Sequence, residues 1–218
     1  MSNLKEEIDY KGMSVKIYYD EDAESPANWD NPDCFLCADY RYLNVNSESI
    51  SAEDCRNTIN ETNRWFLNGF YIFPVSIYDH SGICIHLGTN RGWDYSNGYA
   101  FICVKRRKDW SWTKCKAEKI AQSVVDEWNM YLEGEVYGFV AEDEDESELE
   151  SCWGFYGDEG LADAIQQAKD AIDYELERRA ESERKTREAI LKAHLAKRKA
   201  QIKASAPLYA RTAFAFEY

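Results

Sequence analysis

An uninterrupted helical pattern that runs from Asp158 to about Ser205 constrains this chain more than any other feature of its sequence. Near its start, apolar residues recur every three or four positions and give the helix one face that must be buried: Leu161, Ile165, Ala168, Ile172 and Leu176. Between Glu177 and Glu188 no apolar face remains, which is typical of a helix that is solvated or that bridges two bodies. We therefore expect a long C-terminal helix that is docked only near its start.

Further along this helix, a second and thinner apolar stripe runs beside basic side chains. The stripe consists of Ile190, Leu191, Leu195 and Ile202, and its basic neighbours are Lys192, Lys197, Arg198, Lys199 and Lys203. Pro207 ends the pattern, and the tail 207–218 alternates weakly, as a strand or a docking peptide would. Four roles fit the stripe: a homo-oligomer through this helix, contact with nucleic acid, contact with the acidic body of a second copy, and exposure to solvent.

The net charge changes sign near residue 175, close to where the helix loses its first apolar face. The whole sequence has a net charge of −14, but residues 1–174 hold 34 acidic and 15 basic side chains, a net charge of −19, whereas residues 175–218 carry +5. Aromatic residues make up 14% of the chain, so the acidity belongs to a folded body and not to a disordered tail. We predict an acidic α+β body over 1–174 and a basic helical extension and tail over 175–218. Such a body repels nucleic acid and anionic membranes and attracts basic partners.

The body itself shows alternating strand patterns interrupted by two helical ones. Strands are expected at 13–19, 34–43, 70–78, 83–88, 99–105, 136–142 and 152–157. One helix should begin after Ser51 and stop at Asn68-Gly69, and a second should run over 114–133 between Thr113 and Gly134. The predicted fold is therefore α+β: an antiparallel sheet with a β-meander core, two packed helices and the long C-terminal helix.

The cysteines and the N-terminus indicate the compartment. The seven cysteines are odd in number and irregularly spaced, and the first residues lack the apolar core of a signal peptide. Free thiols in a reducing cytoplasm are the expected state. No apolar run approaches the roughly 18 residues that a membrane span needs. We expect a soluble cytoplasmic protein without membrane association.

Two constellations invite a chemical role. Cys34 and Cys37 have a spacing that can bind zinc or cycle as a disulfide, but no second ligand pair follows and the pair does not open a helix. His80, Cys84 and His86 surround one hairpin and could form a small metal site or a thiol–imidazole pair. A small metal- or thiol-dependent enzyme is thus an alternative. No phosphate-binding loop is present, and we assign no catalytic residue, metal ligand or cofactor.

The acidic side chains themselves are the strongest functional signal. They gather in two stretches, 20–33 and 142–150, which are expected in loops beside a sheet. Carboxylates at a density comparable to DNA phosphates can occupy the basic groove of a nuclease, a repressor or a guide-RNA effector. A solvated acidic surface is the plain alternative. The residues expected to contact a partner are Asp20, Glu21, Asp22, Glu24, Asp30, Asp143, Glu144, Asp145 and Glu146.

Several blocks of the sequence occur in a recognisable order. They are DEDAESPANWDN (20–31), FPVSIYDHSG (73–82), GWDYSNGYAFICV (92–104), EVYGFVAED (135–143) and ESCWGFYG (150–157). Together they resemble an uncharacterised family of small acidic proteins of bacteriophages and mobile elements. That setting implies host takeover or protection from host defence, as in antirestriction and anti-CRISPR inhibitors, many of which are acidic DNA mimics.

The resemblance leads to a specific expectation about function. The chain would be a phage-encoded inhibitor that acts in the host cytoplasm. It would bind a host protein with a basic surface (a nuclease, a restriction enzyme or a CRISPR effector) through its acidic loops. A structural, oligomerising phage protein is a further alternative, in which the C-terminal helix assembles copies and the body presents a surface.

Overall fold

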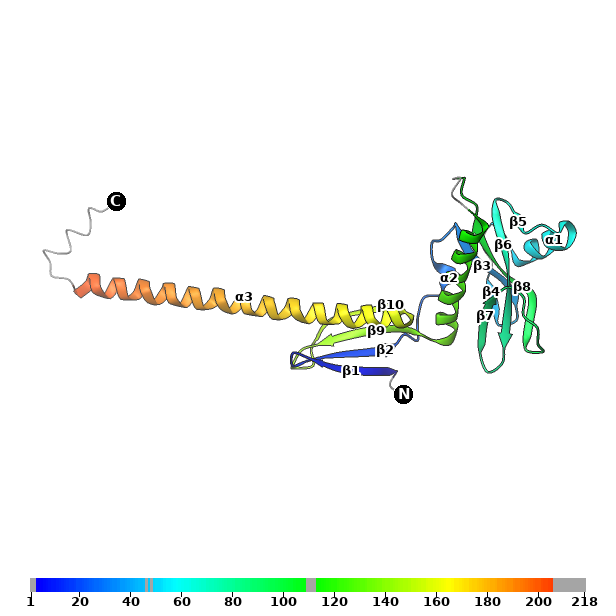
Figure 1. The fold of residues 1–218 in the computed structure, drawn as a ribbon. Coiled ribbons are helices and arrows are strands. Elements are labelled where there is room, and N and C mark those ends of the chain that lie inside the picture. The colour runs from blue at the N-terminus through cyan, green and yellow to red at the C-terminus, as the bar shows by residue number, and fades with distance from the viewer. Residues whose placement is uncertain (1–2, 46, 48, 109–112, 206–218) are drawn as a thin grey trace.

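The structure, a computed structural model, describes residues 3–45, 47, 49–108 and 113–205. Two antiparallel sheets lie side by side, and one long helix extends away from them (Figure 1). The predicted α+β class, with antiparallel strands and a long C-terminal helix, is confirmed. No helix among these residues is both long enough and apolar enough to cross a membrane. The expected strand or docking peptide at 207–218 lies outside the described residues.

The four-stranded sheet joins the two ends of the chain. Its order is β1-β2-β9-β10, so strands from the start of the sequence pair with strands from the end. Their bounds are Leu4–Tyr10, Met13–Tyr19, Val136–Glu142 and Glu148–Tyr156. The sequence did not predict β1, because four of its seven residues are charged and most of its side chains are exposed. Its place depends on pairing with β2, which a local pattern does not reveal.

The six-stranded sheet is inserted between β2 and β9. Its strands are β3 (Cys34–Tyr40), β4 (Leu43–Val45), β5 (Phe66–Leu67), β6 (Phe70–Asp79), β7 (Ile83–Leu87) and β8 (Tyr95–Lys105). The order is β4-β3-β8-β6-β5, with β7 also paired to β6. The expected meander is therefore altered, because β8 pairs with the far side of β6 and not with β7. Residues 100–104 of β8 are all buried, and such a strand belongs in the middle of a sheet covered on both faces.

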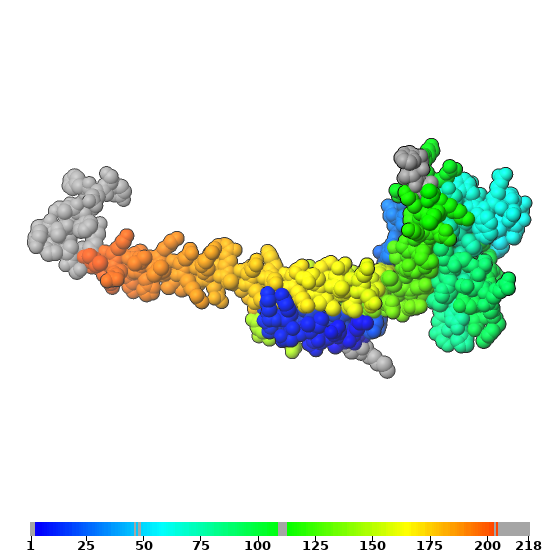
Figure 2. Space-filling model, viewed as in Figure 1, coloured from blue at the N-terminus to red at the C-terminus, as the bar shows by residue number. Residues whose placement is uncertain are grey.

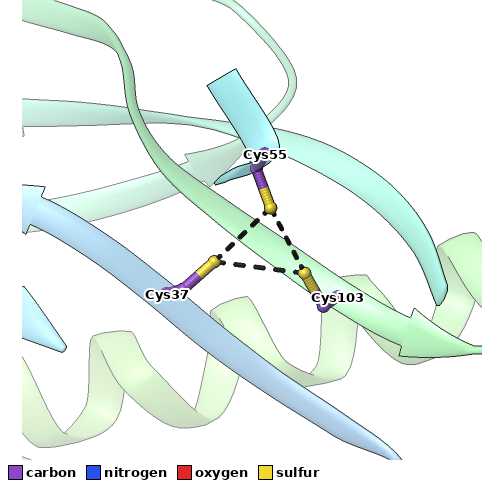
Figure 3. A group of neighbouring side chains, drawn as sticks. All are labelled: Cys37, Cys55 and Cys103. Atoms are coloured by element: carbon purple, nitrogen blue, oxygen red, sulfur yellow. Dashed lines mark hydrogen bonds between the residues drawn. The ribbon is translucent and has the colours of Figure 1, made fainter. Parts of the chain in front are cut away.

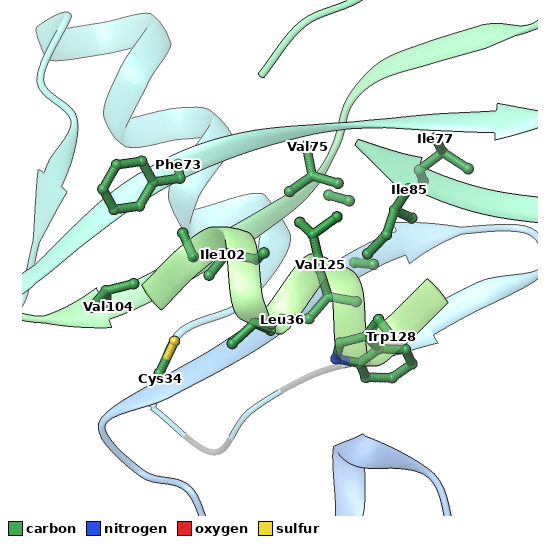
Figure 4. Packing of buried hydrophobic residues seen from close by; sticks show 14 of the residues in the cluster. Cys34, Leu36, Phe73, Val75, Ile77, Ile85, Ile102, Val104, Val125 and Trp128 are labelled. Atoms are coloured by element: carbon green, nitrogen blue, oxygen red, sulfur yellow. The ribbon is translucent and has the colours of Figure 1, made fainter. Parts of the chain in front are cut away.

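Helices cover both faces of this second sheet. Helix α2 (Lys114–Glu133) begins at Thr113 and ends at Gly134, as predicted, and buries Val125 and Trp128 against the sheet (Figure 4). Helix α1 (Ala52–Thr62) packs on the opposite face. It is shorter than expected, because Asn63 adopts a left-handed conformation that ends the helix. The residues that follow form β5 instead of another turn of helix.

Helix α3 (Gly157–Ser205) has 49 residues and therefore a length of about 73 Å at roughly 1.5 Å per residue. Its first turns pack on one face of the four-stranded sheet, where Ala164, Ala168 and Ile172 meet Val15 and Phe139. The side chains of residues 180–200 are exposed, and this part extends beyond the sheets (Figure 2). The predicted division between residues 174 and 175 falls inside this continuous helix.

Candidate functional site

The four-stranded sheet has one covered face and one open face. Because successive strand residues point to opposite sides, Val15 and Ile17 face α3 while Lys16 and Tyr18 lie on the other side. No described helix or strand packs across that second side. Trp153 of β10 belongs to it and is 47% exposed. An indole left half-exposed on an open sheet face marks this surface as a candidate binding site.

The position of Trp153 is set by two glycines. Trp153 is paired with Gly138 of β9, and a Cβ atom added to Gly138 would lie 2.1 Å from Cε3 of the indole. The indole therefore packs directly on the backbone of Gly138, a position that any side chain there would block. Gly154 has a φ of +86°, and the register of β10 shifts between Trp153 and Phe155. This β-bulge bends β10 directly after the indole. The ring extends across β9 and contacts Tyr18 of β2, with centroids 6.1 Å apart.

A shallow groove of about 560 Å³ lies beside this indole. We call it the acidic groove; it is lined by Asn3, Asp20, Glu21, Asp22, Glu24, Trp153 and Gly154. Its described lining contains four carboxylates and one aromatic ring, and none of these residues is basic. Within the described part of the chain, these four carboxylates form no ion pair. The acidic groove thus combines uncompensated negative charge with an apolar ring.

The loop that carries the four carboxylates is held at both ends. At its start, the Asp20 N–H donates to the Val136 carbonyl (2.8 Å), and Asn3 Nδ2 donates to the Tyr19 carbonyl (2.9 Å). At its end, the Tyr156 hydroxyl donates to the Glu24 carbonyl. Burial, and then nearby acidic groups, raise the pKa of Tyr156 to about 12, so this hydroxyl keeps its proton at neutral pH. The carboxylates are therefore fixed next to the end of the sheet.

The second predicted acidic stretch has a different role. Only residues 143–147 form the β9–β10 turn, whereas Glu142 ends β9 and residues 148–150 begin β10 and so do not lie in the expected loop. In the turn, one Asp143 oxygen accepts the N–H groups of Asp145 (3.0 Å) and Ser147 (2.9 Å). Arg179 of α3 pairs with Asp143 at 2.9 Å and with Glu144 at 2.6 Å. Backbone hydrogen bonds, chiefly from Ser147, together with Arg179 lower the pKa of Asp143. These acids fasten the hairpin to the helix and are partly neutralised there.

The structure does not bring the two acidic stretches together. Asp20 is bonded to Val136 at the first residue of β9, whereas Asp143 follows its last residue, Glu142. The stretches therefore lie at opposite ends of the same strand. Of the nine predicted partner-binding residues, Asp20, Glu21, Asp22 and Glu24 share the acidic groove. Asp30, Asp145 and Glu146 are exposed elsewhere.

Cys34 and Cys37 do not form the metal or redox pair that their spacing suggests. They lie three residues apart on β3 and so point to opposite faces of the sheet. Cys34 is buried in the core beneath α2, and Cys37 in the core beneath α1. Cys37 instead lies in contact with Cys55 and Cys103. No local motif in the sequence predicts this group, because its members are far apart along the chain.

The His80, Cys84 and His86 hairpin is only partly assembled. Cys84 Sγ lies 3.5 Å from His86 Nε2, on one face of β7 as expected. His80 lies instead beside Asp94, with Nδ1 3.6 Å from Oδ1. Two tyrosine rings separate the histidines. His86 contacts Tyr95, Tyr95 contacts Tyr78, and Tyr78 contacts His80. Burial raises the pKa of Cys84, which is the opposite of what an activated thiol nucleophile requires.

Comparisons with protein-family models, with curated proteins and with solved structures find no match to this chain. The interpretation of the acidic groove therefore rests on its own geometry. Sequence analysis found the four acids of the groove but missed Trp153. The available signal was Gly154, which directly follows Trp153, because a glycine inside a strand pattern often marks a bulge or a close approach of another group.

Proposed function

We propose that this chain is a binding protein that captures a basic surface of a partner protein in the acidic groove. The observation that carries the proposal is the combination of four carboxylates that form no ion pair with any described residue and a half-exposed indole on the open face of a sheet. Carboxylates attract a cationic side chain over a distance, and the face of an indole holds it at contact by a cation–π interaction.

The chemistry of the groove favours arginine as the side chain that is bound. A guanidinium group is planar, stacks on an aromatic face and forms bidentate hydrogen bonds with carboxylates. Trp153 supplies the face and the loop that follows β2 supplies the carboxylates. Nucleic acid is disfavoured as a ligand of this surface, because phosphates would meet four negative charges without a compensating cation among the described lining residues.

The resemblance to phage and mobile-element proteins supplies a setting for this proposal. In that setting the partner is a host nuclease, restriction enzyme or CRISPR effector whose basic groove normally holds nucleic acid. The chain then acts in the host cytoplasm as a DNA-mimic-like inhibitor that blocks that groove. The location of the acids narrows the expected contact surface from two loops to the one that contains Asp20 and Glu24.

The test is capture of partners from host lysate with two charge-matched variants. One variant replaces the acids of the groove (D20N/E21Q/D22N/E24Q). The control replaces four exposed acids of α3 (E177Q/E181Q/E183Q/E188Q) and so removes the same charge far from the groove. We expect the first variant to lose the partner and the second to keep it, with capture by the wild type weakening as salt rises. Equal capture by both variants would contradict the proposal.

A second function, assembly of copies through the distal part of α3, is favoured by one observation. Ile190, Leu191, Leu195 and Ile202 are 51–61% exposed along one side of this helix. Two such stripes could bury each other. Light scattering on the full chain and on a chain that ends at Ala180 separates this function from the first, because only the full chain would then form an oligomer.

A further inference from the structure

Three cysteine thiols from three separate elements meet in the core beneath α1. Cys37 comes from β3, Cys55 from α1 and Cys103 from β8, and all three are fully buried (Figure 3). Their sulfur atoms form a nearly equilateral triangle, with separations of 3.6 Å (55–103), 3.8 Å (37–55) and 4.0 Å (37–103). We propose that this triangle, the thiol triad, is a binding site for one thiophilic metal ion with a filled d shell.

The size of the triangle matches such an ion. Zinc–sulfur bonds of about 2.3 Å place two sulfurs of a tetrahedral site roughly 3.8 Å apart, and those of a trigonal site roughly 4.0 Å apart. The observed separations span these values, so an ion can enter without a rearrangement of the three elements. Thiolates select soft ions such as Cu(I) and Zn(II) over hard ions such as Mg²⁺.

Two properties of the thiol triad favour different ions. Among the described residues, no fourth histidine, cysteine or carboxylate joins the group. Three ligands suit trigonal Cu(I), whereas structural zinc sites have four. On the other hand, three thiolates around Cu(I) carry a net charge of −2, and around Zn(II) only −1, which is less costly among apolar neighbours such as Ile50 and Ile72. The common element is a thiophilic cation held by three sulfurs.

The three thiols of the triad differ in pKa. Cys55 lies in the first turn of α1, where the positive end of the helix dipole favours a thiolate. Thiol hydrogen bonds with Cys103, and then with Cys37, lower the pKa of Cys55. Hydrogen bonds with Cys37 and then with Cys55, together with burial, raise the pKa of Cys103. Binding of the ion as a three-thiolate complex releases the thiol protons to solvent without any change of oxidation state.

An ion can reach this closed site through α1. The helix has eleven residues, of which only Ala52 and Cys55 are buried, so it is held to the sheet by few contacts. Local opening of such a short element is far less costly than global unfolding. A bound ion would connect α1 to β3 and β8 and close this route. The metal would therefore stabilise the helix that covers one face of the six-stranded sheet.

The test begins with the full chain, unfolded and refolded in the presence of a reductant. One portion is refolded with Zn(II) and another with Cu(I), and each is then freed of loose metal by a chelator. We expect one ion per chain, a higher midpoint of thermal unfolding than the metal-free protein, and a sulfur-to-metal charge-transfer band for the Cu(I) form. Retention of only one of the two ions identifies the physiological candidate. Retention of neither overturns the proposal.

Two substitutions of matched burial give the control. Cys55→Ala removes a sulfur of the triad, and Cys34→Ala removes a buried thiol of β3 that lies outside it. We expect Cys34→Ala to keep one ion and Cys55→Ala to lose it. If Cys55→Ala fails to fold, Co(II) binding by the wild-type chain reports the ligands directly, because three thiolates give intense sulfur-to-cobalt bands. The absence of these bands, or a mass lower by two hydrogens that reveals a disulfide within the triad, contradicts the proposal.

Discussion

Both sheets of this molecule are antiparallel, but helices cover two faces of one sheet and only one face of the other. The six-stranded sheet lies between α1 and α2, so its central strand β8 is buried on both faces. The four-stranded sheet is covered by α3 on one face only, and its other face carries Trp153 and borders the acidic groove. The first sheet is a scaffold whose side chains serve packing. One face of the four-stranded sheet takes no part in core packing, so its side chains are free to bind a partner.

The largest expected effect separates two tryptophans. Trp128 of α2 is 3% exposed in the core of the six-stranded sheet, and Trp128→Ala should destabilise the chain by about 3–5 kcal/mol through loss of burial and cavity formation. Trp153→Ala should cost less than about 1 kcal/mol, because that ring is half-exposed. Chemical denaturation measures both. Similar costs for the two substitutions would contradict the assignment of the four-stranded sheet's open face to binding.

The next effect concerns the fastening of α3 to the four-stranded sheet. Arg179 pairs with Asp143 and Glu144 of the β9–β10 turn and with Glu175 of its own helix. Within α3, hydrogen bonds from Arg178 and then from Arg179 lower the pKa of Glu175 to about 2. Since the pKa is lowered in the folded state, this stabilisation is present above about pH 4.5 and is lost as the pH falls towards 2.

Arg179→Ala should therefore lower the unfolding midpoint at pH 7 and flatten its decline in acid. Thermal unfolding between pH 2 and 7 measures both properties. Arg184→Ala is the control, because Arg184 is exposed and its partner, Glu181, lies on the same helix. An unchanged midpoint at pH 7 in Arg179→Ala would show that the pairs of Arg179 with Asp143 and Glu144 do not fasten the helix.

A smaller effect is expected where Trp153 rests on the sheet. In Gly138→Ala, the added Cβ atom overlaps the indole, so the ring must leave its position over β9. Because the ring can move towards solvent, we expect a stability cost below about 1 kcal/mol but a clear loss of partner binding. Gly98→Ala gives the converse case: its added Cβ meets no atom within 4 Å, but its φ of +80° strains an alanine, so its stability should fall while partner binding stays unchanged. Undiminished binding by Gly138→Ala would show that the position of the ring is unimportant.

The smallest effect is expected at the far end of α3. A chain that ends at Ala180 keeps Leu176 and Arg179, the last contacts with the four-stranded sheet. Its unfolding midpoint should match that of the full chain, because the side chains of 181–200 are exposed and the ion pairs of this segment are internal to the helix. A lower midpoint that depends on protein concentration would instead reveal an assembly that this segment stabilises.

The elements that the sequence predicted are those with a local signal. Helix α2 has a cap at each end, and the buried face of α3 recurs at helical spacing. The division into two sheets was missed, because β2 pairs with β9 from the opposite end of the chain. The same limitation applied to the sites. The two acidic stretches look alike in sequence, and only the tertiary contact of Arg179 with Asp143 separates the fastened stretch from the free one.

The indole N–H signals of the tryptophans show whether the open face of the four-stranded sheet binds a basic partner. Trp153 and Trp93 are both exposed, at 47% and 88%, but only Trp153 borders the acidic groove. In a titration with an arginine-rich peptide at low salt, followed by NMR, the Trp153 signal should shift and the Trp93 signal should stay. Equal shifts of both signals, or an unmoved Trp153 signal, would contradict the account.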